Sequence, residues 1–237
     1  MRNDVIRHML LIEEPSILKL HQELMNIAIY ALGPLFIIAV ILEFFGELNF
    51  GAVLKKLMII SIVMTCFYQF HTTAVSVALE AASSTLQRVS PKNIFVKKWY
   101  EVKIRTGEKR DWGFLERFAI PNLNDLVATG FFLLSKVFIW LLKLIYSTVY
   151  HFTYLFSGIT AALYLLGWTK DALKGTVQGS IWCMLMPFVV IAILALVGNS
   201  FVEAADTGEL IFSKIDTIVW LFGVTLLLLL SPVITLG

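Results

Sequence analysis

The sequence has little cysteine and little charge, and both shortages exclude classes of protein. Its two cysteines, Cys66 and Cys183, stand far apart and form no CxxC pair, so neither a disulfide framework nor a structural zinc site is supported. We expect both to be small apolar core residues. Charged residues make up only 15% of the chain and hydrophobic residues 58%, a balance that excludes a water-soluble domain of 237 residues.

Signatures of catalysis are also missing. Ser157-Gly158 has no GxSxG elbow, and His21-Gln22-Glu23 is not followed by the second histidine of a zinc-protease helix. Glycine-rich phosphate loops are absent too, so we expect no enzyme activity, no cofactor and no metal. Charged residues interrupt the first 22 positions, which therefore lack the apolar stretch of a cleavable signal peptide.

What the sequence does have is apolar runs long enough to cross a bilayer, and the mean hydropathy of the whole chain is +0.81. The run 126–168 has 43 residues, of which only Lys136 and Lys143 are charged. A hydrocarbon core of about 30 Å needs about 20 helical residues, so we expect this run to cross twice. The turn is expected where polar residues gather near its middle, at Ser147, Thr148, Tyr150 and His151.

The chain is therefore predicted to be an all-α integral membrane protein with about six transmembrane helices. Residues 1–25 are expected to hold an N-terminal amphipathic helix at the membrane interface, with a helix restart at Pro15. The first two spans lie in 26–79, a basic and cytoplasmic loop in 80–125, and four further spans in 126–237. The expected spans are 26–45, 57–79, 126–148, 152–168, 177–198 and 211–236.

Basic residues predict the orientation of these spans. With the N-terminus in the cytoplasm, the cytoplasmic segments hold 14 Lys and Arg, whereas the opposite side holds only Lys55 and Lys56. This contrast follows the positive-inside rule. If the long run crossed only once, Lys170 and Lys174 would change sides and the contrast would fall to 12 against 4.

Lys136 and Lys143 stand seven residues apart, on one helical face with Tyr150. One reading is a water-filled passage or an ion-pairing seam, with Glu43 and Asp216 as candidate partners. The other reading is that Lys143 reaches the outer headgroups while Lys136 packs against another subunit.

His71 is accompanied by Gln69, Thr72 and Thr73, which would line a polar pathway; the alternative is one structural hydrogen bond between helices. The central loop interleaves basic and aromatic residues. Side chains of these two types bind either an anionic membrane surface or a nucleic acid, and we favour the membrane surface. Its candidate contacts are Lys97, Lys98, Trp99, Lys103, Arg105, Lys109 and Arg110.

The N-terminal third resembles a known family in its layout. Leu32-Gly33-Pro34-Leu35-Phe36-Ile37-Ile38-Ala39 is followed by a short loop ending in Phe50 and by Leu54-Lys55-Lys56-Leu57, and 163–187 fits the same plan. This resembles the polytopic inner-membrane subunit of type IV secretion and conjugal transfer machines, the TrbL-like superfamily.

The resemblance implies a multimeric scaffold or translocation-channel subunit in a bacterial inner membrane. Its implied partners are membrane lipids, further copies of the chain and other subunits of the machine, with nucleic acid only as transient cargo. The alternative is a small transporter or ion channel that uses the intramembrane lysines and histidine.

Overall fold

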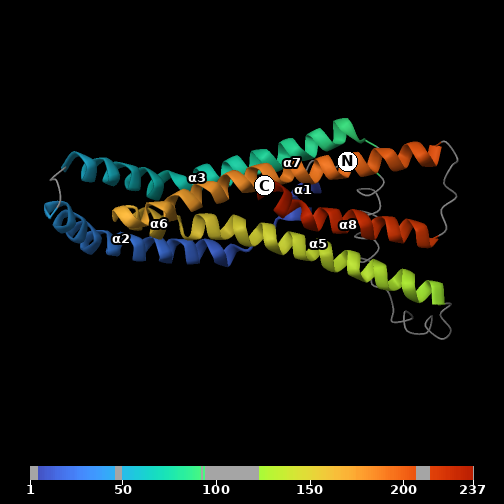
Figure 1. The fold of residues 1–237 in the computed structure, drawn as a ribbon, viewed down its shortest axis with the longest axis horizontal. Coiled ribbons are helices and arrows are strands. Elements are labelled where there is room, and N and C mark those ends of the chain that lie inside the picture. Colours follow the sequence, from blue (N-terminus) through green and yellow to red (C-terminus); the bar gives the residue numbers. More distant parts are fainter. Residues whose placement is uncertain (1–4, 46–49, 92, 94–122, 207–213, 237) are drawn as a thin grey trace. The chain divides into compact units, whose positions relative to one another are not determined.

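The computed structural model describes residues 5–45, 50–91, 93, 123–206 and 214–236, and every regular element in these ranges is a helix (Figure 1). In chain order they are α1 (Val5–Leu10), α2 (Pro15–Phe44), α3 (Phe50–Val89), α5 (Leu123–Leu155), α6 (Ser157–Leu163), the short 3₁₀ helix η2 (Gly167–Thr169), α7 (Lys170–Asp206) and α8 (Lys214–Leu236). The all-helical prediction is confirmed for these residues.

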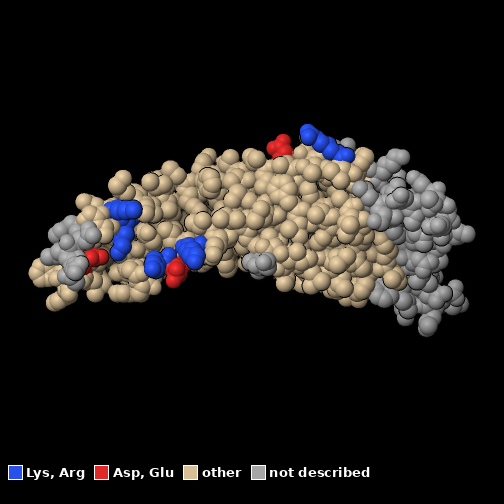
Figure 2. All heavy atoms as spheres, turned by 45° about the horizontal axis from the view of Figure 1, so that its top comes forward, with Lys and Arg blue, Asp and Glu red and all other residues tan. Residues whose placement is uncertain are grey.

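Three helical segments of the described chain are long and apolar enough to cross a membrane: Pro15–Phe44, Gly51–Val89 and Gly167–Val197. A shorter apolar stretch, Phe222–Thr235, lies in α8. The face drawn in Figure 2 carries few charged side chains, as expected of such helices. The predicted count of six spans is not confirmed.

Contacts divide the chain into two compact units, each described by itself. The first unit comprises Met1–Leu10, Leu79–Leu144 and Met186–Gly237, and the second comprises Leu11–Ala78 and Ile145–Leu185. Helices α3, α5 and α7 contribute residues to both.

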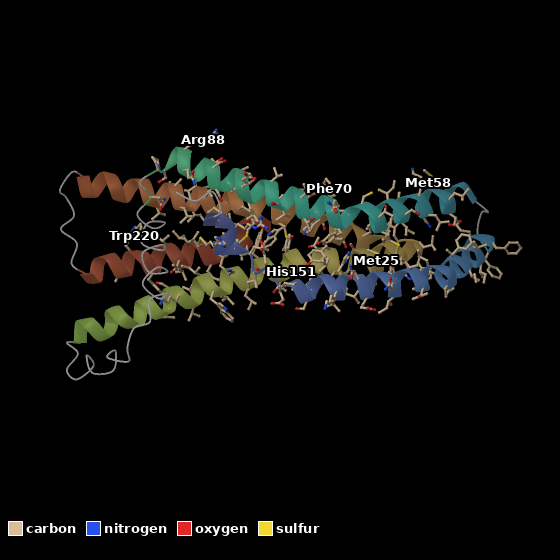
Figure 3. The ribbon with its side chains drawn as sticks, turned by 180° about the vertical axis from the view of Figure 1, so that it is seen from behind. Met25, Met58, Phe70, Arg88, His151 and Trp220 are labelled. Atoms are coloured by element: carbon tan, nitrogen blue, oxygen red, sulfur yellow. The ribbon has the colours of Figure 1, made fainter. Side chains whose placement is uncertain are left out.

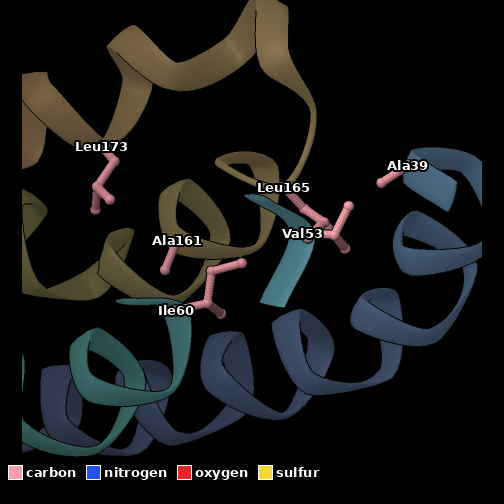
Figure 4. Close-up of a cluster of buried hydrophobic side chains, with 6 residues drawn as sticks. All are labelled: Ala39, Val53, Ile60, Ala161, Leu165 and Leu173. Atoms are coloured by element: carbon pink, nitrogen blue, oxygen red, sulfur yellow. The ribbon is translucent and has the colours of Figure 1, made fainter. Parts of the chain in front are cut away.

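An aliphatic cluster forms part of the core of the second unit (Figure 4). It joins α2, α3, α6 and the start of α7 through Ala39, Val53, Ile60, Ala161, Leu165 and Leu173. Close approach of α6 to α2 depends on Gly158, because a Cβ built there would lie 2.8 Å from the Met25 sulfur and 3.3 Å from the Ala28 Cβ. A glycine at this position therefore permits the helices to touch.

The N-terminal helix α1 packs into the first unit. Its Ile6 and Leu10 side chains are fully buried, and the Ile6 amide donates to Ser83 Oγ at 3.4 Å. Within the same unit, Asn93 Nδ2 donates to the Leu194 carbonyl of α7 at 2.9 Å. Helix α1 ends at Leu10, and the helix that restarts at Pro15 continues without a break through the first predicted span.

Helix α2 begins at Pro15, where the sequence predicts a restart, because proline at the first helical position lacks only an amide hydrogen that would have no partner there. Glu14 before it is extended, and its carboxylate accepts from Ser16 Oγ at 2.7 Å.

The predicted turn at 147–151 is wrong. Helix α5 continues to Leu155, only Phe156 separates it from α6, and the chain reverses at 164–169, just before α7. The polar groups of Ser147 and His151 do not face solvent at a turn, because both side chains are buried and hydrogen-bonded to the backbone of Ile12. Residues 126–168 therefore run through α5 and α6 before the chain reverses, without a turn near the middle of the run.

The predicted loop 80–125 begins too early. Helix α3 continues to Val89, because its last turns place Ala82 and Leu86 in the buried interior of the first unit. Hydrophobic spacing along 80–89 is helical, and the loop prediction rested on charge alone.

Candidate functional site

His71 lies at the centre of a polar cluster inside the second unit. Its side chain is fully buried on α3, with Nδ1 2.8 Å from Ser180 Oγ of α7 and Nε2 3.2 Å from the Tyr150 carbonyl of α5. A carbonyl only accepts hydrogen bonds, so Nε2 carries the proton and Nδ1 accepts from the serine hydroxyl. One imidazole thus joins three helices, and its ring stacks on Phe67.

His151 makes the second set of contacts, one turn before the end of α5 (Figure 3). Its Nε2 lies 2.8 Å from the Ile12 carbonyl, and its Nδ1 lies 2.8 Å from the Tyr154 hydroxyl. The Ile12 amide donates in turn to Ser147 Oγ at 2.8 Å. Two side chains of α5 therefore satisfy both backbone groups of a residue that stands between α1 and α2, outside any helix.

His21 on α2 completes the cluster. Its ring stacks on Tyr68 with centroids 5.0 Å apart, and it meets the edge of Tyr154 at 5.4 Å. The side chain is only 7% exposed, and among the described residues its Nδ1 has no hydrogen-bond partner. The sequence places His21 in the segment 1–25 that is expected at the membrane interface, and the structure shows its ring buried against α3 and α5.

We call these side chains the histidine–tyrosine cluster: His21, Tyr68, His71, Tyr150, His151 and Tyr154. Sequence reasoning found His71 and named His151 as a turn residue, but it missed Tyr68 and Tyr154. Their signal was present in the spacing, since Tyr68 and His71 stand three residues apart and Tyr150 and Tyr154 four apart, each pair on one helical face. The cluster holds helices α2, α3, α5 and α7 together through neutral polar groups.

The two predicted lysines have different surroundings. Lys136 is exposed, whereas Lys143 is half-buried and donates from Nζ to the His8 carbonyl at 3.0 Å. His8 stands in the last turn of α1, where a cation is favoured by the helix dipole and by the helix's unbonded carbonyls.

The predicted partners of these lysines are not found with them. Glu43 pairs instead with Lys56, at 3.7 Å, and Lys56 also donates to the Leu165 carbonyl at 3.4 Å. The Asp216 side chain lies outside the part that the structure describes. Gln69 is exposed while His71 is buried, so these two do not line one pathway.

The predicted lipid or nucleic-acid contacts of the basic loop lie outside the described residues: Lys97, Lys98, Trp99, Lys103, Arg105, Lys109 and Arg110. Within the ranges that are described, no three His, Cys, Asp or Glu side chains are grouped to hold a metal ion.

Comparison with known proteins adds no assignment: no family model, no curated protein and no solved structure matches the chain.

Proposed function

We propose that this chain is a multi-pass scaffold or translocation-channel subunit of a secretion or conjugation machine in a bacterial inner membrane, without catalysis of its own. Its N-terminus is on the cytoplasmic side. The layout of its apolar segments, the charge asymmetry of its loops and the resemblance stated above support this role.

The observation that carries the proposal is how His71 and His151 are used. Each histidine engages both ring nitrogens with protein groups, and the groups they engage belong to α5, to α7 and to the segment between α1 and α2. A conduction pathway needs polar side chains that face water, whereas these face one another and the backbone. Polar groups used in this way stabilise a helical assembly.

The outer surface of α2 and α3 supports a role among lipids and other subunits. Only 11% of the most apolar window of each helix is buried by the rest of the chain. Large side chains such as Tyr30, Phe44 and Met58 are 81%, 67% and 67% exposed. In a membrane these surfaces contact lipid or neighbouring proteins, not water.

The test is extraction from native membranes in mild detergent, followed by native mass spectrometry and identification of the subunits that co-purify. We expect an assembly that contains other secretion-machine subunits and membrane lipids, and we expect deletion of the chain to abolish secretion or conjugation. A monodisperse and active monomer would contradict the proposal.

A small transporter or ion channel is the second candidate, and one observation favours it. The buried Nδ1 of His21 has no partner among the described residues, and a buried polar atom of this kind usually binds a water or an ion. Ion or solute flux through proteoliposomes that contain only this chain, abolished by His21→Phe, would select this candidate over the scaffold.

A further inference from the structure

The outward face of α3 carries a heptad repeat. Its members stand alternately four and three residues apart, which is the spacing of the core positions of a left-handed coiled coil. They are Met58, Ile62, Thr65, Gln69, Thr72 and Ser76. We call this set the α3 seam.

The seam lies opposite the face that α3 uses inside its own unit. Ile60, Phe67 and His71 are buried there, whereas Met58 and Ile62 of the seam are 67% and 59% exposed. Thr65 and Gln69 are exposed as well, whereas Thr72 and Ser76 are half-buried. A second regular row of side chains that the chain's own fold leaves largely uncovered is typical of a helix that packs against another molecule.

The polar members of the seam differ in whether their side chains have hydrogen-bond partners within the chain. Thr65 Oγ1 donates to the Ser61 carbonyl at 2.7 Å, and Thr72 Oγ1 donates to the Tyr68 carbonyl at 2.9 Å, so both hydroxyls are satisfied within α3. Gln69 is exposed, and among the described residues no group bonds its carboxamide. Hydrocarbon offers a carboxamide no partner, so this side chain is costly against lipid.

A carboxamide is both a donor and an acceptor, so it pairs with a copy of itself. Copies in one membrane share an orientation, and a two-fold axis along the membrane normal places identical residues of two parallel helices at the same depth. One buried polar side chain at a core position of a heptad repeat specifies register and partner. The seam carries no charge that would require an oppositely charged partner.

We infer that the α3 seam binds the same seam of a second copy of this chain, with the Gln69 carboxamides hydrogen-bonded across the two-fold axis. Thr65 is small and stands one turn away, which permits close approach of the two helices. This inference names a partner for the proposed assembly role. It depends on the proposed function in one respect, that α3 lies within a bilayer.

The test uses the full chain in native membranes with Cys66 replaced by serine. Contrary to the sequence-based expectation of a core residue, Cys66 is exposed, and its removal leaves only the fully buried Cys183. A disulfide needs Cα atoms about 4.4–6.8 Å apart, which a seam position meets in such a dimer. We expect Thr65→Cys to form a disulfide-linked dimer under mild oxidation, and Phe70→Cys, which is 60% exposed but off the seam, to remain monomeric.

The carboxamide is tested on the same background by Förster transfer between labelled copies diluted in lipid. Gln69→Leu is expected to weaken association about tenfold, since hydrogen bonds between membrane helices contribute modestly. Gln69→Asn should retain it. Gln178→Leu, which removes an exposed glutamine from α7, is the matched control and should leave it unchanged.

Three outcomes would overturn the inference: no Thr65→Cys dimer, equal cross-linking at positions 65 and 70, or Gln69→Leu that associates as well as the parent. A seam covered by lipid or by a different protein gives the first of these. Failure of the proposed function can be told apart from failure of this inference. If only the proposed function fails, the Thr65→Cys dimer forms but no secretion-machine subunit co-purifies.

Discussion

Removing the His71 ring should destabilise the second unit strongly. His71→Ala leaves a cavity, which costs about 3 kcal/mol for a ring of this size in a packed interior. It also removes the hydrogen bonds to Ser180 and to the Tyr150 carbonyl, each worth about 0.6 kcal/mol between membrane helices. We therefore expect the free energy of unfolding to fall by about 4 kcal/mol.

Two further variants separate packing from hydrogen bonding. His71→Phe keeps most of the ring volume and should cost about 1–2 kcal/mol, mainly through the unbonded Ser180 hydroxyl. A double-mutant cycle with Ser180→Ala should give a coupling energy between about 0.5 and 1.7 kcal/mol.

The assay is unfolding of the purified chain by dodecyl sulfate in mixed micelles. His8→Ala is the control, because that side chain is exposed, and it should change stability by less than about 0.5 kcal/mol. A His71→Ala variant within about 1 kcal/mol of the parent, or a coupling energy of zero, would refute the structural role of the cluster.

Three further predictions follow from other parts of the chain. On a Cys66→Ser background, Trp168→Cys should react with an impermeant thiol reagent added from outside and Thr148→Cys should not, because the chain reverses at 164–169; the opposite pattern would restore the turn at 147–151. Lys136→Leu should leave both assembly and secretion intact, since its side chain is exposed, and loss of secretion with normal assembly would support a conduction role. Gly158→Val should lower stability by about 1–3 kcal/mol through its clash with α2, measured by the same dodecyl sulfate titration. Gly33→Ala, with nothing within 4 Å of its new Cβ, should not lower it, and equal losses would contradict the close contact.

Much of the helical course could be predicted from the sequence, because apolar runs and a proline at a helix start report local physics. Pro15 marks the start of α2, and the apolar stretches fall within α2, α3, α7 and α8. Such local signals could not show whether the chain turns at 147–151. Polar residues in an apolar run mark either a loop or a contact between helices, and only the presence of Ile12 beside Ser147 and His151 decides between them.

The candidate site shows the same limit. Histidine at position 71 was conspicuous within its span, but its three-helix bonding depends on residues 79 and 109 positions away. His21 is flanked in sequence by Lys19 and Glu23, which give no sign of burial, whereas its neighbours in space are Tyr68 and Tyr154. The pairing of Glu43 with Lys56, not with an α5 lysine, likewise follows from which helices are adjacent.

The bonds that α5 makes to Ile12 impose an order on biosynthesis. Ser147 follows Ile12 by 135 residues, and a ribosome that adds about 5–20 residues per second makes it roughly 7–27 s later. During that interval the amide and carbonyl of Ile12 have neither of their final partners, although α2 has already been synthesised. The segment between α1 and α2 therefore makes its final contacts only after α2, α3 and most of α5 have been synthesised, so the N-terminal end of the chain is completed well after it has left the ribosome.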